Sequence, residues 1–466
     1  MVEVPGWVRA HSRPMSSAPA AQPRIAEQLR PGFAALAGLF LGLALLKFGN
    51  PAILDHLVVR PKEYLEFVIQ PWPLAWGYSL LGLVAVLGLV AADWRLPRPR
   101  WPVFLPLAWL AWQFLAATWT TDTRLTAVTL PYFTATVVGF YLGLFALAPS
   151  SRMSIFWAAL IGCFSAVLIL GFQQRFGGLE EVRKAVYAQP DWQKLPADYM
   201  KRLATNRIFA TLLYPNALAG VILLLLPAAA TATWQLAGRL AVWPRRVLVG
   251  GLVAAGLACL YWTKSKAGWL IALGLGLVWF WRLPVARKLK LALAGLALVA
   301  GLAGFALRFA GYFERGATSA SARLEYWRAG WKTACAHPVF GAGPGTFAAS
   351  YRAIKPPGAE MAMLTHNDYL QQASDSGFPG AVLYLAFVGG SLAVLRRRAG
   401  ADPLTFAVWL GLLGWALQSL AEFGLYVPAV GWAAFWFLGW LWGVAGEGPV
   451  TKNQPAENQG TRKRSA

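Results

Sequence analysis

The chain has 466 residues, of which 57% are hydrophobic and only 13% are charged, and its mean hydropathy is +0.48. Repeated apolar runs of about 17 to 25 residues are each long enough to cross the hydrocarbon core of a bilayer, which excludes a soluble globular protein. The net charge of +22 suggests no nucleic-acid partner, because the chain has no soluble basic domain. In a membrane protein, excess Lys and Arg indicates topology.

The apolar runs predict an all-α polytopic membrane protein with about twelve transmembrane helices. The expected spans cover residues 32–48, 72–92, 101–118, 127–148, 153–172, 208–230, 246–262, 267–282, 289–309, 379–395, 403–421 and 425–445. Short basic loops follow the second, sixth, eighth and tenth spans. With twelve spans these loops and both termini lie on one side, which the positive-inside rule assigns to the cytoplasm.

The expected organisation has five parts. Polar cytoplasmic tails cover residues 1–31 and 447–466, and the first tail precedes a retained anchor rather than a secretory signal. Transmembrane helices one to nine occupy 32–309, and helices ten to twelve occupy 379–446. Between them, residues 310–378 form a large outer loop that we expect to contain short helices and the catalytic residues.

Cysteine and histidine give no metal or disulfide pattern. The chain has three Cys and four His. Cys163 and Cys259 lie inside apolar runs, and three of the histidines are scattered along the chain. We therefore expect no metal and no other cofactor.

The fourth histidine, His366, lies in the polar stretch that ends the outer loop. Thr365 and Asp368 have capping-box spacing, so we expect a helix to begin at His366. A histidine in the first helical turn feels the positive end of the helix dipole, which favours neutral imidazole and a role as general base. The alternative is a polar cap close to the membrane with no chemistry.

Two further features precede it in the outer loop. Leu324, Trp327 and Trp331 have the spacing of an amphipathic helix, although the tryptophans also suit an aromatic belt. The Gly- and Pro-rich stretch 337–345 suits either a plain turn or close backbone approach to a phosphate.

Four cations recur near the outer ends of the spans: Arg207, Lys264, Lys266 and Arg323. The positive-inside rule disfavours such positions, and each residue alone is explained by anchoring at the membrane interface. Together with a general base, however, they suggest an anionic ligand such as a phosphate. Pro215 and Asn216 are expected to disturb the sixth span about two turns after its start.

The chain has no Walker-type loop, no nucleotide motif and no Ser/His/Asp arrangement. On the outer side of a membrane, nucleotide sugars and ATP are absent. A reaction there must use a preactivated donor carried in the membrane, and a lipid-linked sugar diphosphate meets this requirement.

These motifs resemble those of the O-antigen ligase and polymerase superfamily of bacterial envelopes. His366-Asn367, nine residues, then Gly377 and Gly380 are similar to its His-[Asn/Ser/Gln]-x9-Gly-x-x-[Gly/Thr/Tyr] signature. Arg323 and Trp327 resemble its Arg-x-x-x-Trp helix, and residues 337–347 resemble its Gly-rich loop. Residues 215–219 are similar to its Pro-Asn-x-x-Ala segment, and the resemblance covers roughly residues 200–395.

The resemblance implies a metal-independent, inverting transfer of a glycan from undecaprenyl diphosphate, at the periplasmic face of the bacterial inner membrane. His366 is expected to activate the acceptor hydroxyl, and Arg323 and Lys266 to hold the donor diphosphate. Lys266 departs from the usual Arg, so Lys264 is expected to share this task, and Arg207 is a further addition. The signature residues Asn367, Gly377 and Gly380 complete the expected substrate site.

We expect a ligase first, and three alternatives to it remain open. A ligase passes the glycan to lipid A core, another glycolipid or a protein, whereas a polymerase extends lipid-linked repeats with the same donor chemistry. A membrane transporter, as described for bicarbonate in some relatives, predicts charges or broken helices at the midplane of the membrane. The remaining alternative is an envelope component without catalytic activity.

Overall fold

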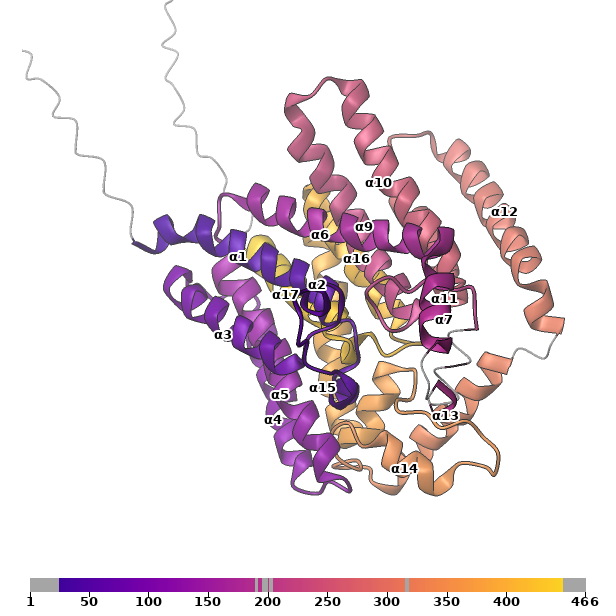
Figure 1. The fold of residues 1–466 in the computed structure, drawn as a ribbon. Helices are drawn as coiled ribbons and strands as arrows, with labels where there is room; N and C mark the ends of the chain where they lie inside the picture. The colour runs from indigo at the N-terminus through magenta and orange to yellow at the C-terminus, as the bar shows by residue number, and fades with distance from the viewer. Residues whose placement is uncertain (1–24, 189–191, 195–199, 201–203, 315–317, 447–466) are drawn as a thin grey trace, which may run out of the picture.

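The computed structural model describes residues 25–188, 192–194, 200, 204–314 and 318–446, so most of the two predicted tails lies outside the described residues. All regular structure in the described part of the chain is helical (Figure 1). The predicted all-α polytopic membrane fold is therefore confirmed.

The long apolar helices follow the predicted order of spans. The first group contains α1 (Ile25–Lys47), α3 (Leu74–Ala91), α4 (Trp101–Ala117), α5 (Thr123–Tyr141, continued by η2, Leu142–Leu147) and α6 (Met153–Gln173). The second contains α9 (Pro215–Leu236), α10 (Val242–Thr263), α11 (Lys266–Phe280) and α12 (Arg287–Glu314). The third contains α15 (Asp368–Arg398), α16 (Pro403–Gln418) and α17 (Pro428–Gly446).

Short helices lie between these groups. They are η1 (Ala52–Leu57), α2 (Tyr64–Ile69), η3 (Gln174–Gly178), α7 (Leu179–Tyr187), η4 (Trp192–Lys194), η5 (Ala237–Arg239), α13 (Thr318–Ala336), α14 (Phe347–Ile354), η6 (Ala399–Ala401) and η7 (Gly424–Tyr426). The helix expected in the outer loop around Trp327 is thus α13.

Among the described residues, nine helices are long and apolar enough to cross a membrane. Three shorter apolar helices, α4, α11 and α16, coincide with the other expected spans. With 15 residues, α11 is about 22 Å long, less than the roughly 30 Å of a hydrocarbon core. The count of twelve crossings stays a prediction.

The start of the sixth expected span differs from the structure in a way that matters for the site. Residues 208–214 precede the helix instead of forming its first turns, because α9 begins at Pro215. Proline is favoured in the first turn of a helix, where its missing N–H and fixed φ carry no penalty. Pro215 therefore starts the helix rather than disturbing it, and the irregular segment before it is available to shape a site.

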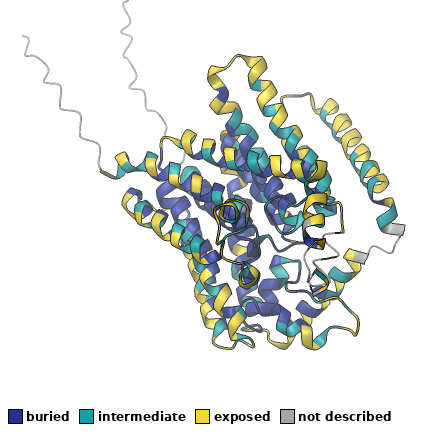
Figure 2. Ribbon diagram, viewed as in Figure 1, coloured by how far each residue is buried: buried dark blue, intermediate teal, exposed yellow. Residues whose placement is uncertain are grey.

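The centre of the bundle is α17, where Trp432, Trp436 and Trp442 are fully buried. It packs on α1 and on the α5–η2 helix. Gly439 allows this contact, because a Cβ atom there would lie 1.9 Å from the Phe140 carbonyl oxygen. By contrast, α12 lies at the edge of the bundle and is exposed along most of its length (Figure 2).

We expect Gly439→Leu to lower the free energy of unfolding by about 1–3 kcal/mol, because two helix backbones must separate to admit the side chain. Unfolding in a denaturant titration of the detergent-solubilised protein measures the change. Gly250→Leu is the matched control, since a Cβ at Gly250 in α10 meets no atom within 4 Å. Equal stability of the two variants would contradict the close helix contact.

Helix α15 is interrupted at Ser376 and Gly377. Gly377 has φ +71°, and a Cβ there would lie 2.1 Å from the Val339 carbonyl oxygen. The Gly- and Pro-rich stretch fills this break, since the Phe378 amide donates to Pro338 at 2.9 Å. Gly377 is thus required by close backbone packing.

Candidate functional site

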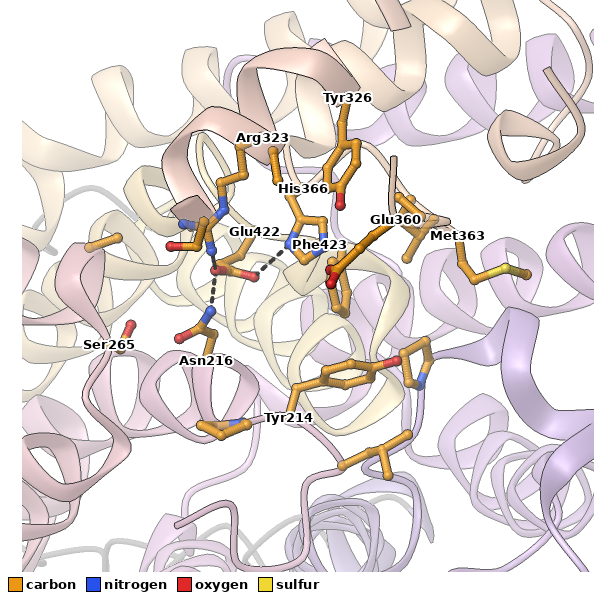
Figure 3. Close-up of a pocket in the computed structure, with 18 of the residues that line it drawn as sticks. Tyr214, Asn216, Ser265, Arg323, Tyr326, Glu360, Met363, His366, Glu422 and Phe423 are labelled. Carbon is orange, nitrogen blue, oxygen red and sulfur yellow. Dashed lines mark hydrogen bonds and ion pairs between the residues drawn. The ribbon is translucent and has the colours of Figure 1, made fainter. Parts of the chain in front are cut away.

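A cavity of about 710 Å³ opens where several predicted functional segments meet (Figure 3). Most of its walls come from residues 205–216 before and at the start of α9, 264–267 between α10 and α11, 319–326 of α13, 360–366 before α15, and 422–423 between α16 and α17. Segments separated by more than 200 positions in the sequence therefore share one site.

Five of the eight predicted site residues line this cavity: Arg207, Lys264, Lys266, Arg323 and His366. Asn367, Gly377 and Gly380 do not line it. Asn367 caps α15, Gly377 allows the break in that helix, and a Cβ at Gly380 would lie 2.2 Å from the Ser376 hydroxyl oxygen. These three residues shape the helix next to the cavity.

His366 does not lie in the first turn of a helix, and this prediction was wrong. Helix α15 begins two residues later at Asp368, and Asn367 is its N-cap, accepting the Leu370 amide at 3.0 Å. Asparagine is a strong N-cap residue, which explains the shift. His366 has φ +54°, and Thr365 donates to the Asn367 carbonyl at 2.8 Å, so a tight turn aims the imidazole.

The turn directs the His366 ring toward a carboxylate. Its Nδ1 lies 3.2 Å from Oε2 of Glu422, and the ring is held between Tyr326 and Phe423, with ring centroids 5.8 and 4.7 Å away. A carboxylate only accepts hydrogen bonds, so Nδ1 is the donor, and in the neutral tautomer that donates from Nδ1 the lone pair lies on Nε2. This is the arrangement of a general base oriented by an acid.

The motif tryptophan supports the same turn. Trp327 donates from Nε1 to the His366 carbonyl oxygen at 3.4 Å. Arg323 lies one turn earlier on α13. The same helix therefore brings the Arg323 guanidinium to the cavity and the Trp327 indole to the His366 backbone.

Glu422 is buried and joins four segments of the chain. It is paired with Arg323 and accepts a hydrogen bond from Asn216 Nδ2 at 2.5 Å. Asn216 Oδ1 in turn accepts from Arg207 at 2.7 Å, and Arg207 Nε donates to the Thr263 carbonyl at 2.7 Å. The network fixes two guanidinium groups at the cavity, and Figure 3 shows Glu422 between Asn216 and His366.

The electrostatics keep this carboxylate ionised. Burial raises the pKa of Glu422, but the Arg323 guanidinium and the hydrogen bond from His366 outweigh burial and hold that pKa below its ordinary value of 4.5. Glu422 therefore remains an anion at neutral pH, and its charge would favour a proton on the neighbouring His366 ring.

Glu422 was not among the site residues predicted from the sequence. Its position could have indicated a role, because it is an acidic residue in the short connection between the last two apolar runs. The predicted topology puts this connection on the same side as His366. Asn216 was noted only as a helix disturbance, although it bonds both Glu422 and Arg207.

The two lysines flank a tight turn between α10 and α11. Lys264 has φ +52°, and Ser265 caps α11 by accepting the Gly268 amide at 3.2 Å. Burial, together with the cations Arg308, Arg207 and Arg175, lowers the pKa of Lys264. Within the described residues neither Lys264 nor Lys266 forms an ion pair, so both lysines offer charge to a ligand.

Lys266 is positioned by α12. Its Nζ lies 3.8 Å from the Tyr312 ring centroid and 5.3 Å from that of Phe309. Cation–π contact fixes an ammonium without neutralising its charge. In the described part of the chain, no group of three or more His, Cys, Asp or Glu side chains is placed to hold a metal ion.

Residues 251–385 match the family model described as O-antigen ligase. This match places an O-antigen ligase domain in the chain. The matched segment runs from α10 into α15 and contains Lys264, Lys266, Arg323 and His366. No curated protein matches the chain.

The resemblance predicted from the motifs is thus confirmed. The superfamily implies a multi-pass bacterial membrane protein acting on lipid-linked glycans. Arg207, Asn216 and Glu422 lie outside the matched segment, and the fold brings them to the same cavity.

Proposed function

We propose that this protein transfers a glycan from undecaprenyl diphosphate to an acceptor hydroxyl at the periplasmic face of the bacterial inner membrane. The single observation that carries the proposal is the cavity in which His366, oriented by Glu422, lies among Arg207, Lys264, Lys266 and Arg323. A general base beside several cations suits a reaction that deprotonates a hydroxyl and releases a diphosphate.

In the proposed step, Nε2 of His366 takes the proton from the acceptor hydroxyl. The oxygen forms a bond to the anomeric carbon of the donor while the bond from that carbon to the diphosphate oxygen breaks, which inverts the anomeric configuration. Arg323 and Lys266 hold the diphosphate and stabilise its negative charge as it leaves, with Lys264 and Arg207 adding positive charge. The imidazolium then returns its proton to water.

The proposed topology follows from the basic loops. Both termini lie in the cytoplasm, and residues 310–378 with the connections at 205–216, 264–267 and 422–423 lie on the periplasmic side. This orientation brings all residues of the proposed reaction to the side where a lipid-linked donor is the available source of activated sugar.

The acceptor separates a ligase from a polymerase. We favour a ligase acting on lipid A core, another glycolipid or a protein. A deletion strain that accumulates finished, unattached polymer on undecaprenyl diphosphate supports a ligase, whereas a strain that accumulates single repeats supports a polymerase.

Transport is the weaker interpretation. Helix α15 is broken, as transport predicts, but the break is filled by protein: the Ala342 and Gly343 amides donate to the Ser374 and Asp375 carbonyls at 2.9 Å each. Its backbone groups are therefore satisfied without an ion.

We expect Arg323→Ala to abolish most donor binding, because the variant removes the guanidinium that faces the cavity and unpairs Glu422. The measurement is the Kd for an undecaprenyl-diphosphate glycan with protein in liposomes, and we expect a rise of about 10-fold or more. Arg152→Ala is the control, since Arg152 is exposed and outside the cavity. Unchanged donor affinity in Arg323→Ala would overturn the diphosphate site.

A further inference from the structure

Three cations lie together at the C-terminal end of α10, beside the cavity. The guanidinium carbon of Arg175 in η3 lies 6.0 Å from the Trp262 ring centroid, and that of Arg308 in α12 lies 4.8 Å from the Tyr261 ring centroid. Lys264 follows these two aromatic residues in the chain. We call Arg175, Lys264 and Arg308 the rim cations. Arg175 and Arg308 do not line the cavity, whereas Lys264 does.

The rim cations are close enough to repel one another. Burial lowers the pKa of Lys264 most, and the charges of Arg308, Arg207 and Arg175 lower it further. Within the described residues, none of the rim cations forms an ion pair. No carboxylate in that part of the chain neutralises them, and a bound anion would relieve the repulsion.

Aromatic rings hold the two arginines of this group in place. Arg308 is half-buried and also lies 5.7 Å from the Phe309 ring centroid, and its Nε is shielded from solvent without a hydrogen-bond acceptor among the described residues. Arg175 also lies 5.8 Å from the Phe176 ring centroid. A cation that only anchors a helix extends freely into the headgroup region. Cation–π contacts instead keep these charges beside α10 and leave them available to a ligand.

Exposed apolar side chains lie next to the rim cations. Leu307 and Phe176 are sequence neighbours of the two arginines and are 81% and 73% exposed. On α10, Leu257 lies one turn before Tyr261, and both are exposed. Helix α12 is exposed along most of its length (Figure 2). A ligand with an anionic head and a hydrocarbon tail would therefore meet matching surfaces for both parts.

The proposed topology puts the rim cations at the level of the outer leaflet. With twelve spans, α6, α10 and α12 all end on the periplasmic side, and Arg308 lies near that end of α12. The anions abundant at this depth of a membrane are lipid phosphates. Arginine binds a phosphate through two parallel N–H groups, and lysine adds a point charge.

We propose that the rim cations bind the phosphate headgroup of a lipid in the outer leaflet, whose hydrocarbon tail lies along α10 and α12. Two kinds of lipid carry this chemistry: an anionic phospholipid of the bilayer and a lipid-linked diphosphate. The inference uses the proposed topology but not the proposed glycan transfer, because Arg175 and Arg308 lie outside the lining of the cavity.

The test uses full-length protein in phosphatidylcholine liposomes that contain a photoactivatable phosphatidylglycerol probe. It measures the mole fraction of probe that gives half-maximal crosslinking to η3, α10 and α12. We expect the Arg175→Gln, Arg308→Gln double variant to need about 10-fold or more probe than wild type, because two charges that attract the phosphate are lost. An unchanged mole fraction in the double variant would overturn the inference. So would a wild type that crosslinks a phosphatidylcholine probe equally well, since choline cancels the phosphate charge.

Arg124→Gln is the matched control for the loss of an arginine. Arg124 is exposed in the first turn of α5, which the predicted topology puts on the same side of the membrane, and it is not a rim cation. This variant should crosslink like wild type. A loss equal to that of the double variant would show a general effect of positive charge and would overturn the specific site.

Unlabelled competitors identify the source of the phosphate. Displacement of the probe by undecaprenyl diphosphate or by phosphatidylglycerol supports the site, and the lipid that acts at the lower mole fraction is its ligand. Displacement by neither lipid, or equally by inorganic phosphate, would overturn a lipid site. Release of undecaprenyl diphosphate from a glycan donor is measured in parallel. Donor turnover with a failed probe result rejects the rim site alone, whereas probe binding without donor turnover rejects the proposed function alone.

Discussion

His366→Ala is expected to lower the rate of glycan transfer by about 10²–10⁴-fold, the range of general base catalysis. The loss should fall on kcat, because the imidazole acts on the acceptor hydroxyl and the cations hold the donor. The measurement is product formation by protein reconstituted in liposomes with an undecaprenyl-diphosphate glycan, alongside the donor Kd of the same preparation.

His56→Ala provides the control for this experiment. His56 lies in the last turn of the short helix η1, is exposed and does not line the cavity, so its removal should leave transfer unchanged. Full activity of folded His366→Ala protein would contradict the proposed mechanism. The histidine would then be part of a polar turn, and the transport interpretation would regain weight.

The second large effect is expected at Glu422. Removing its charge leaves the half-buried Arg323 guanidinium without its partner and frees the imidazole of His366, so Glu422→Gln should lose both stability and activity. Breaking a buried ion pair costs about 3–5 kcal/mol, and we expect the lower end because Arg323 is 21% exposed. Thermal unfolding and the transfer assay measure the two losses.

Two measurements distinguish a role of Glu422 in orienting His366 from a role in packing alone: the kcat of a charge-conserving variant and the pH dependence of stability. Glu422→Asp keeps the charge and should recover part of kcat, which a merely structural role would not require. The wild-type pKa of Glu422 lies below 4.5, so its stabilising effect is present above that pH and is lost as the pH falls through the folded-state pKa. The stability gap between wild type and Glu422→Gln should therefore close in acid. A gap independent of pH would contradict the ionised carboxylate.

Hydropathy predicted the helices, because long apolar runs have few alternatives in a bilayer. Hydropathy did not settle how many helices cross the membrane, since α4, α11 and α16 are shorter than the other apolar helices. The cations of the cavity were also predicted from the sequence, because Lys and Arg on the expected outer side contradict the usual charge asymmetry.

The details of the site depend on partners that lie far apart in the sequence. Both Thr365, through its capping-box spacing, and Asn367 could serve as the N-cap of α15, and in the structure Asn367 does so. The contact between Glu422 and His366, which lies 56 positions earlier, becomes visible only in the folded chain. The signature residue Gly377 reflects close packing against residues 338–339, which no spacing along one segment reveals.

The peripheral position of α12 has a consequence for the dynamics of the site. This helix packs chiefly on α11 and buries little surface, so we expect its amides to exchange hydrogen sooner than those of the central α17. Yet α12 carries the rings that hold Lys266. One of the charges at the cavity is thus held by a peripheral helix that buries little surface. Small displacements of α12 would move the Lys266 side of the cavity, which suits the proposed binding and release of a bulky lipid-linked donor.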